Sequence, residues 1–159
     1  MNIVMRRGLI LTLALVLLAG FGCKKRLDDQ NPGDEPMTQE EAAAAAKISS
    51  GVIYFEFDRY DLKAESKQVL TQKAAIVKQF PRLRVLIEGH TDERGTEEYN
   101  LALGERRARA AYEFLLNLGV NANQLDMISM GKLHPAKEGS GESVWAMNRR
   151  DEFKVSKPR

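Results

Sequence analysis

The chain has 159 residues, of which 43% are hydrophobic and 29% are charged. This composition is typical of a globular protein with one core, and the length suggests a single domain with extensions. The formal net charge is +2, and the excess comes from Arg6 and Arg7 at the extreme N-terminus. The rest of the chain is formally neutral. This argues against a nucleic-acid-binding protein, because such domains are usually strongly basic.

The first 22 residues have the plan of an export signal. Two arginines precede an almost unbroken aliphatic run, LILTLALVLL, and the small-residue segment AGFG follows it. The run is too short to span a bilayer comfortably, since a spanning helix needs roughly 20 apolar residues. The only cysteine, Cys23, comes next, so no internal disulfide is possible. We predict a signal peptide over residues 1–22.

The segment ending at Cys23 resembles the lipobox of bacterial lipoproteins, although Gly20 and Phe21 depart from its usual pattern. We therefore predict lipid attachment at Cys23, with an uncleaved membrane anchor as the alternative. Two or more acyl chains suffice for stable anchoring. By resemblance to lipoproteins in general, Lys24 after the cysteine favours the outer membrane over the inner one.

Residues 23–50 are predicted to hold the lipidated cysteine and a flexible tether. KKRLDDQNPGDEPM is polar and has no apolar periodicity, as expected of a linker. The sequence TQEE then offers a capping-box pattern ahead of AAAAAK. Because no large apolar residue precedes Ile48, a short helix and a continuation of the tether both stay open here.

From Gly51 the pattern becomes that of a folded domain, which we predict over residues 51–159. Apolar and polar residues alternate over residues 52–57, as in a strand. A helix follows, with Asp61 as its expected cap, and Pro81 stops it.

The second half of the domain repeats this order. A strand runs through residues 83–87, and a second helix begins at the hydroxyl cap Thr96 and ends at Gly119. Further strands are predicted over residues 124–130 and 152–155.

A long loop over residues 132–143 precedes the last of these strands. The order is strand, helix, strand, helix, strand, strand. It predicts a small α+β domain in which two helices pack on one face of a four-stranded mixed sheet.

The second predicted helix carries an arginine in the middle of its apolar face. This follows for Arg107 from a projection at about 100° per residue. A buried unpaired charge costs several kcal/mol, so Arg107 needs a carboxylate or an equivalent partner. One interpretation is an internal ion pair with an acid on a neighbouring strand, and the other is a ligand.

Asp92 lies in the loop that leads into this helix. An Asp and an Arg so placed can pair together or face a ligand that carries both charges. A zwitterion would use both, with its ammonium group on Asp92 and its carboxylate on the guanidinium of Arg107. Asp58 at the end of the first strand could line the same concavity, and Asn100 lies on the same side of the helix as Arg107.

The segments YFEFDRYDL, IEGHTDERGTEEYNLALGERRA and MNRR resemble the OmpA-like peptidoglycan-binding domain. The resemblance covers residues 51–155, and the family signature of Thr-Asp, Leu-Gly and Arg-Ala falls between Thr91 and Ala108. It implies binding of the stem peptide of uncrosslinked peptidoglycan through its diaminopimelate residue. It assigns the ammonium group to Asp92 and the carboxylate to Arg107.

The resemblance also implies further residues at this site: Phe57, Asp58, Asn100, Leu103 and Arg150. One position departs from the family pattern. Asp151 follows MNRR, where family members commonly have an apolar residue that starts the last strand. The start and register of that strand therefore stay open, and with them the role of Arg150.

Enzymatic activity is the first alternative function, because His90 and two nearby acids suggest a metal hydrolase of the cell wall. A zinc site usually needs three or four ligands, and the only other histidine, His134, precedes a proline in a loop. The sequence contains no HExxH or GxSxG pattern. We expect no catalysis, no metal and no cofactor.

A protein-interaction module is the second alternative. The resemblance, together with the lipobox, implies binding to TolB and to other Tol-system or OmpA-like proteins. The two roles are compatible, because a lipid-anchored domain that grips peptidoglycan tethers the outer membrane to the cell wall. Envelope integrity and cell division are the processes that this implies.

Overall fold

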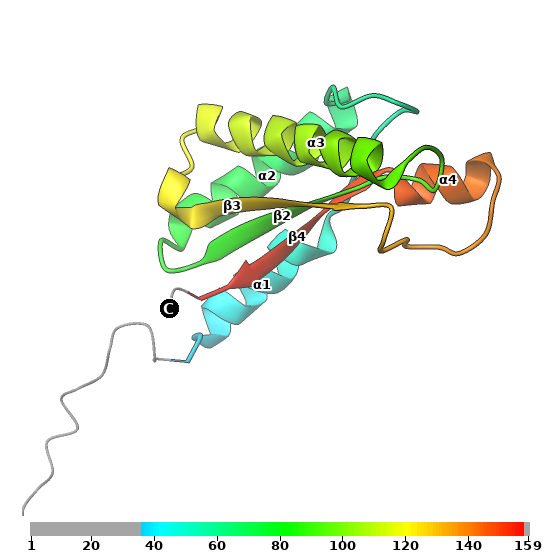
Figure 1. The fold of residues 1–159 in the computed structure, drawn as a ribbon. Coiled ribbons are helices and arrows are strands. Elements are labelled where there is room, and N and C mark those ends of the chain that lie inside the picture. The colour runs from blue at the N-terminus through cyan, green and yellow to red at the C-terminus, as the bar shows by residue number, and fades with distance from the viewer. Residues whose placement is uncertain (1–35, 158–159) are drawn as a thin grey trace, which may run out of the picture.

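A four-stranded sheet carries the fold (Figure 1), and the computed structural model describes residues 36–157. The strand order is β1-β4-β2-β3. β2 is parallel to β3 and antiparallel to β4, so the sheet is mixed as predicted. The predicted signal peptide and Cys23 lie outside the described residues. The strands are β1 (Ile53–Tyr54), β2 (Arg84–His90), β3 (Leu125–Gly131) and β4 (Arg150–Ser156).

Helices α2 and α3 lie side by side across the sheet (Figure 1), which confirms the predicted α+β class. The structure has a helix before β1, where the sequence left a short helix open, and an unpredicted helix before β4. The latter, α4, lies at the end of the sheet where β2 ends and α3 begins. In residues 36–157 no helix has the length and apolar character needed to cross a membrane. The helices are α1 (Gln39–Ser50), α2 (Ala64–Gln79), α3 (Glu97–Asn117), the 3-10 turn η1 (Ala122–Gln124) and α4 (Glu142–Asn148).

Of the two alternatives for residues 38–50, the structure forms the helix. Thr38 caps α1 in a reciprocal box, because the backbone of Glu41 donates to the Thr38 hydroxyl and the Glu41 carboxylate accepts from the backbone of Thr38. Ile48 is buried in the common core with Phe153 of β4. The packed part of the chain therefore begins before residue 51.

Two glycines bring α3 unusually close to β2. A Cβ atom on Gly89 would lie 2.0 Å from the carbonyl oxygen of Gly104. A Cβ on Gly104 would lie 2.7 Å from the carbonyl oxygen of Gly89 on β2 and 2.4 Å from the hydroxyl of Ser129 on β3. Only glycine fits at such a contact. The close approach places Arg107, one helical turn later, over the end of the sheet.

Several boundaries differ from the predictions. β1 is limited to Ile53–Tyr54, although a strand was predicted over residues 52–57. Asp61 does not cap α2, because it pairs with Arg59 at 2.6 Å and the helix begins after Lys63 without a side-chain cap. The predicted loop over residues 132–143 includes the start of α4. β4 begins at Arg150 rather than at residue 152, because Asp151 pairs in register with both β1 and β2.

Candidate functional site

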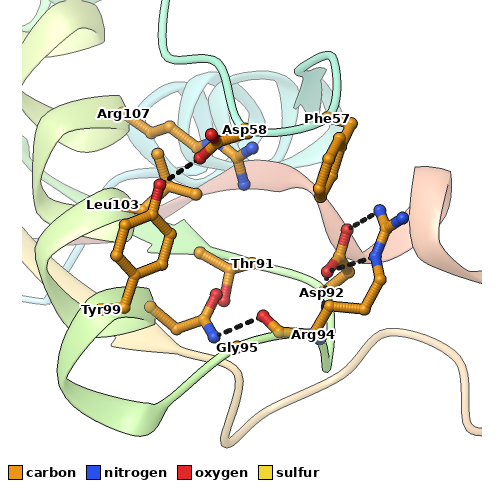
Figure 2. Close-up of a pocket in the computed structure, with 10 residues that line it drawn as sticks. Phe57, Asp58, Thr91, Asp92, Arg94, Gly95, Tyr99, Leu103 and Arg107 are labelled. Carbon is orange, nitrogen blue, oxygen red and sulfur yellow. Dashed lines mark hydrogen bonds and ion pairs between the residues drawn. The ribbon is translucent and has the colours of Figure 1, made fainter.

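A pocket of about 220 Å³ lies where β2 ends and α3 begins. Its walls come from the loop after β1, the loop after β2 and the first turns of α3 (Figure 2). It brings together six of the seven predicted ligand-binding residues; the seventh, Arg150, does not line it. The lining residues are Phe57, Asp58, Thr91, Asp92, Arg94, Gly95, Tyr99, Asn100, Leu103 and Arg107.

Arg107 is fully buried, with 0% of its surface exposed. Its guanidinium donates to three backbone carbonyl oxygens: Nε to Arg59 at 2.8 Å, Nη1 to His90 at 2.8 Å and Nη2 to Glu56 at 3.2 Å. None of these acceptors is a carboxylate. Because a guanidinium has five N–H donors, two remain for other acceptors. Arg107 is thus held in the pocket wall by the backbone.

The acid that most favours the Arg107 cation electrostatically is Asp151 on β4. Burial lowers the pKa of Arg107 to about 10, while the charges of Asp151 and then Asp92 favour its cation. Burial also raises the pKa of Asp151 well above its usual range. Within the described part of the chain, neither carboxylate oxygen of Asp151 has a hydrogen-bond partner. Arg107 therefore stays cationic at neutral pH without a hydrogen-bonded ion pair.

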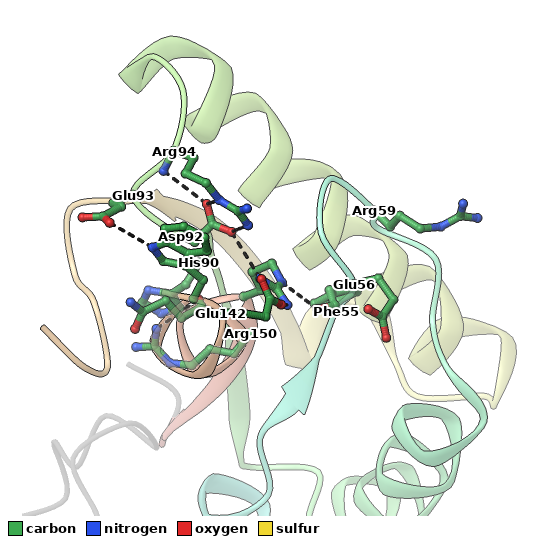
Figure 3. Close-up of polar contacts among 12 residues, drawn as sticks. Phe55, Glu56, Arg59, His90, Asp92, Glu93, Arg94, Glu142 and Arg150 are labelled. Carbon is green, nitrogen blue, oxygen red and sulfur yellow. Dashed lines mark hydrogen bonds and ion pairs between the residues drawn. The ribbon is translucent and has the colours of Figure 1, made fainter. Parts of the chain in front are cut away.

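Asp92 is buried and is bonded by two arginines (Figure 3). Its Oδ1 accepts from Nε of Arg94 at 3.1 Å and from the Arg94 backbone at 3.2 Å. Its Oδ2 accepts from Nη2 of Arg94 at 2.6 Å and from Nη1 of Arg149 at 3.4 Å. Burial acts to raise the pKa of Asp92, but the bonds from Arg94 and Arg149 outweigh it and lower that pKa. The pocket thus holds an ionised carboxylate.

The arginine of MNRR that reaches this carboxylate is Arg149, and Arg150 lies elsewhere. Arg149 also donates from Nε to the carbonyl of Phe55 at 3.1 Å, which fixes its position. Arg150 donates to Glu152 at 2.7 Å and to the carbonyl of His134 at 3.3 Å. Since β4 begins at Arg150, the two neighbours point into different clusters.

The remaining lining residues shape the pocket. The Asn100 amide donates to the carbonyls of Arg94 at 2.8 Å and Thr96 at 2.9 Å, which holds the loop before α3. The Tyr99 hydroxyl donates to the carboxylate of Asp58 across the opposite end of the pocket from Asp92 (Figure 2). At the rim lies Phe57, 56% exposed, and buried Leu103 forms part of the wall.

Four lining residues were not predicted: Thr91, Arg94, Gly95 and Tyr99. Thr91 is buried, and its hydroxyl has no hydrogen-bond partner among residues 36–157, so it can serve a ligand. Arg94 had one local signal. The backbone N–H of a residue two positions after an aspartate can donate a hydrogen bond to that aspartate's carboxylate, as in an Asx turn.

One group of side chains has the composition of a metal site. Oxygen and nitrogen atoms of Glu88, His90 and Glu152 come within 4.8 Å of one another. However, Arg150 and Lys154 both bond the Glu152 carboxylate, at 2.5 and 2.6 Å. Burial lowers the pKa of His90 to about 4, so its ring is neutral. The charges are already balanced by side chains, and we assign no metal here.

The fold and pocket define the class of protein. Residues 54–149 match the model of the OmpA family, and the chain belongs to that family. It closely resembles peptidoglycan-associated lipoproteins. It is 44% identical to the peptidoglycan-associated lipoprotein of Pseudomonas aeruginosa, over 86% of this chain and 75% of that protein. Identity to the one from Pseudomonas putida is 38%, over 92% of this chain and 96% of that protein.

Solved structures agree with this relationship. The crystal structure of the peptidoglycan-associated lipoprotein from Burkholderia pseudomallei matches with a TM-score of 0.67 at 41% identity. The match covers 69% of this chain and 93% of the Burkholderia chain. The C-terminal domain of Helicobacter pylori MotB matches with a TM-score of 0.63 at 24% identity, over 68% of this chain and 85% of that one. The second likeness concerns the fold alone.

Proposed function

We propose that this chain is an envelope lipoprotein that binds peptidoglycan without catalysing a reaction on it. The observation that carries the proposal is the pocket, which places an ionised carboxylate and a buried guanidinium at one site. The names of the relatives, peptidoglycan-associated lipoprotein, support the choice of ligand.

The ligand in this proposal is the diaminopimelate residue of an uncrosslinked stem peptide, a zwitterion at its free end. Its ammonium group binds Asp92, and its carboxylate accepts from the N–H groups that Arg107 does not use and from the Thr91 hydroxyl. Phe57, Asp58, Asn100 and Leu103 belong to the same site. We leave Arg150 out of it and include Arg149, because Arg149 supports Asp92 directly.

We further propose that acyl chains on Cys23 hold the protein in the outer membrane, and that TolB and other Tol-system proteins bind it. The resemblance and the lipobox support this part of the proposal. The domain would then link the membrane to the wall mechanically and contribute to envelope integrity and cell division.

The test is co-sedimentation of the full chain with purified sacculi. Asp92→Asn removes the charge that binds the ammonium group, and Arg107→Lys removes the guanidinium that binds the carboxylate. Each substitution in this two-residue clamp should weaken binding about tenfold or more. Asp126→Asn and Arg109→Lys make the same chemical changes outside the pocket and should bind as the parent does. Soluble stem peptide with diaminopimelate should compete.

Normal binding by a folded Asp92→Asn variant would overturn the proposed site. Thermal denaturation of each variant separates a lost ligand contact from a lost fold. As a further arm, Cys23→Ser should leave the membrane fraction. A Cys23→Ser protein that stays in membranes with unchanged mobility would overturn the lipid anchor and leave the ligand proposal standing.

A further inference from the structure

The Asp92 carboxylate is already occupied by a cation of the protein itself. Nε of Arg94 meets Oδ1 at 3.1 Å and Nη2 meets Oδ2 at 2.6 Å, so the guanidinium covers both oxygens (Figure 2). This bidentate geometry is the strong form of an arginine–carboxylate pair. Together with the Arg94 backbone and Arg149, this guanidinium gives each Asp92 oxygen two donors, so an ammonium group needs a donor to leave before it can bind there fully.

Two aromatic rings hold the Arg94 guanidinium in this position. Its central carbon lies 3.9 Å from the ring centre of Phe57 and 4.0 Å from that of Trp145. Trp145 is itself fixed, because its Nε1 donates to the carboxylate of Glu93 at 2.9 Å. Stacking on ring faces stabilises a guanidinium without using any acceptor. The position is therefore built by contacts from three directions.

The side chain of Arg94 can nevertheless leave while the loop stays in place. The carbonyl of Arg94 is held by Asn100, and its backbone N–H remains on Asp92. The side chain is 31% exposed, and Phe57 at the rim is mostly exposed. Asp92 also keeps its bond from Arg149. Rotation of one side chain is enough to open the carboxylate to a ligand.

We infer that Arg94 is a resident competitor that occupies the ammonium subsite of the free protein and sets its selectivity for zwitterions. A ligand gains access to Asp92 only by bringing a cation that replaces the guanidinium. An acidic peptide without a free amine leaves Arg94 in place and gains nothing from Asp92. Because one ion pair is exchanged for another, binding of the ligand also stays weak and reversible. This inference rests on the proposed function.

The test measures binding of two probes to the full chain in detergent by calorimetry. The first is a stem tetrapeptide with meso-diaminopimelate, and the second is the same peptide with that residue's free amine acetylated. Arg94→Ala should bind the free-amine peptide about fivefold more tightly than the parent, the size of one partly exposed ion pair. Its affinity for the acetylated peptide should not change. Arg109→Ala removes the same charge outside the pocket and should match the parent with both probes.

The outcomes separate this inference from the proposal beneath it. If the parent prefers the free-amine peptide but Arg94→Ala binds it more weakly, Arg94 contacts the ligand and is no competitor. An equal gain for both peptides would also overturn the inference, because the effect would not depend on the ammonium group. If the parent binds neither peptide, the proposed function fails. Arg94→Lys keeps the charge without the bidentate pair and should fall between parent and alanine variant.

Discussion

The adjacent residues Arg149 and Arg150 belong to two different charge clusters, whose cations bind different kinds of acceptor. In the pocket cluster, defined by Asp92, Arg94, Arg107 and Arg149, the most buried cation is bonded to backbone carbonyls. In the sheet cluster, defined by Glu88, His90, Arg150, Glu152 and Lys154, the cations are bonded directly to carboxylates on the same strand.

This difference explains why one cluster suits a ligand and the other does not. Backbone bonds fix Arg107 independently of any acid, so two of its donors and the carboxylate of Asp92 can be shared with a ligand. Asp92 and Glu152 are each bonded by two cations, but Asp92 lines the pocket and Glu152 does not. That doubled pairing, stronger than burial, lowers the pKa of Glu152 to about 2. The charges of the sheet cluster are already paired within it, and the cluster acts as a structural network.

The largest effect should come from removing Arg107. Arg107→Ala leaves three backbone carbonyl oxygens without their donor, of which that of His90 is in a fully buried bond, and opens a void in the wall of the core. We expect the free energy of unfolding to fall by about 3 kcal/mol or more, since each unsatisfied buried group costs roughly 1–3 kcal/mol. Urea denaturation measures this. The exposed variant Arg109→Ala should show little change, and an equally small change for Arg107→Ala would contradict the backbone anchoring.

A smaller, pH-dependent effect is expected at Asp151. Burial raises the pKa of this carboxyl in the folded state, against the opposing charges of Arg107 and Arg150. When the pKa of a group is higher in the folded state, its contribution to stability is fully present below the pKa of the unfolded state, about 3.9 for Asp. The contribution is lost as pH rises through the pKa of the folded state. Asp151→Asn removes this dependence, because the amide takes up no proton on folding.

The Asp151→Asn variant should therefore gain on the parent protein as pH rises from 4 to 7. Each pH unit between the two pKa values changes the difference in unfolding free energy by about 1.4 kcal/mol. Denaturation curves at both pH values measure it. A variant that is less stable than the parent at pH 7 would instead show that Asp151 is ionised and stabilises Arg107.

Arg107 and Asp92 show how much of the candidate site could be predicted from the sequence. The helical projection isolates Arg107 as a charge on an apolar face, and the loop places Asp92 nearby. The hydrogen-bond acceptors of Arg107 could not be predicted from the sequence, because the backbone carbonyls of Glu56, Arg59 and His90 have no residue-specific signal. An ion pair and a backbone anchor therefore look alike in the sequence.

The remaining differences arise from contacts between distant segments. Which arginine of MNRR faces the pocket depends on the residue at which β4 begins, and a shift of one residue exchanges the two faces of a strand. The capping box indicates α1, but its stability depends on the burial of Ile48 in a core that includes Phe153, which is distant in the sequence. α4 has only seven residues and is too short for a clear periodicity.

The smallest effect should follow from a change in the sheet cluster. Lys154 is bonded to Glu152 at 2.6 Å and lies 3.8 Å from Glu88, but its side chain is 55% exposed. A pair so close to solvent contributes about 0.2–1 kcal/mol and is weakened by salt. Lys154→Ala should therefore lower the free energy of unfolding by no more than about 1 kcal/mol, with a difference that shrinks at high salt.

The same variant should bind sacculi as the parent protein does, because Lys154 lies outside the pocket and Arg150 still neutralises Glu152. Co-sedimentation of Lys154→Ala beside Asp92→Asn compares the two clusters in one experiment. Loss of binding in a folded Lys154→Ala protein would mean that the sheet cluster also meets the ligand. The functional distinction between a shared pocket and a closed network would then be wrong.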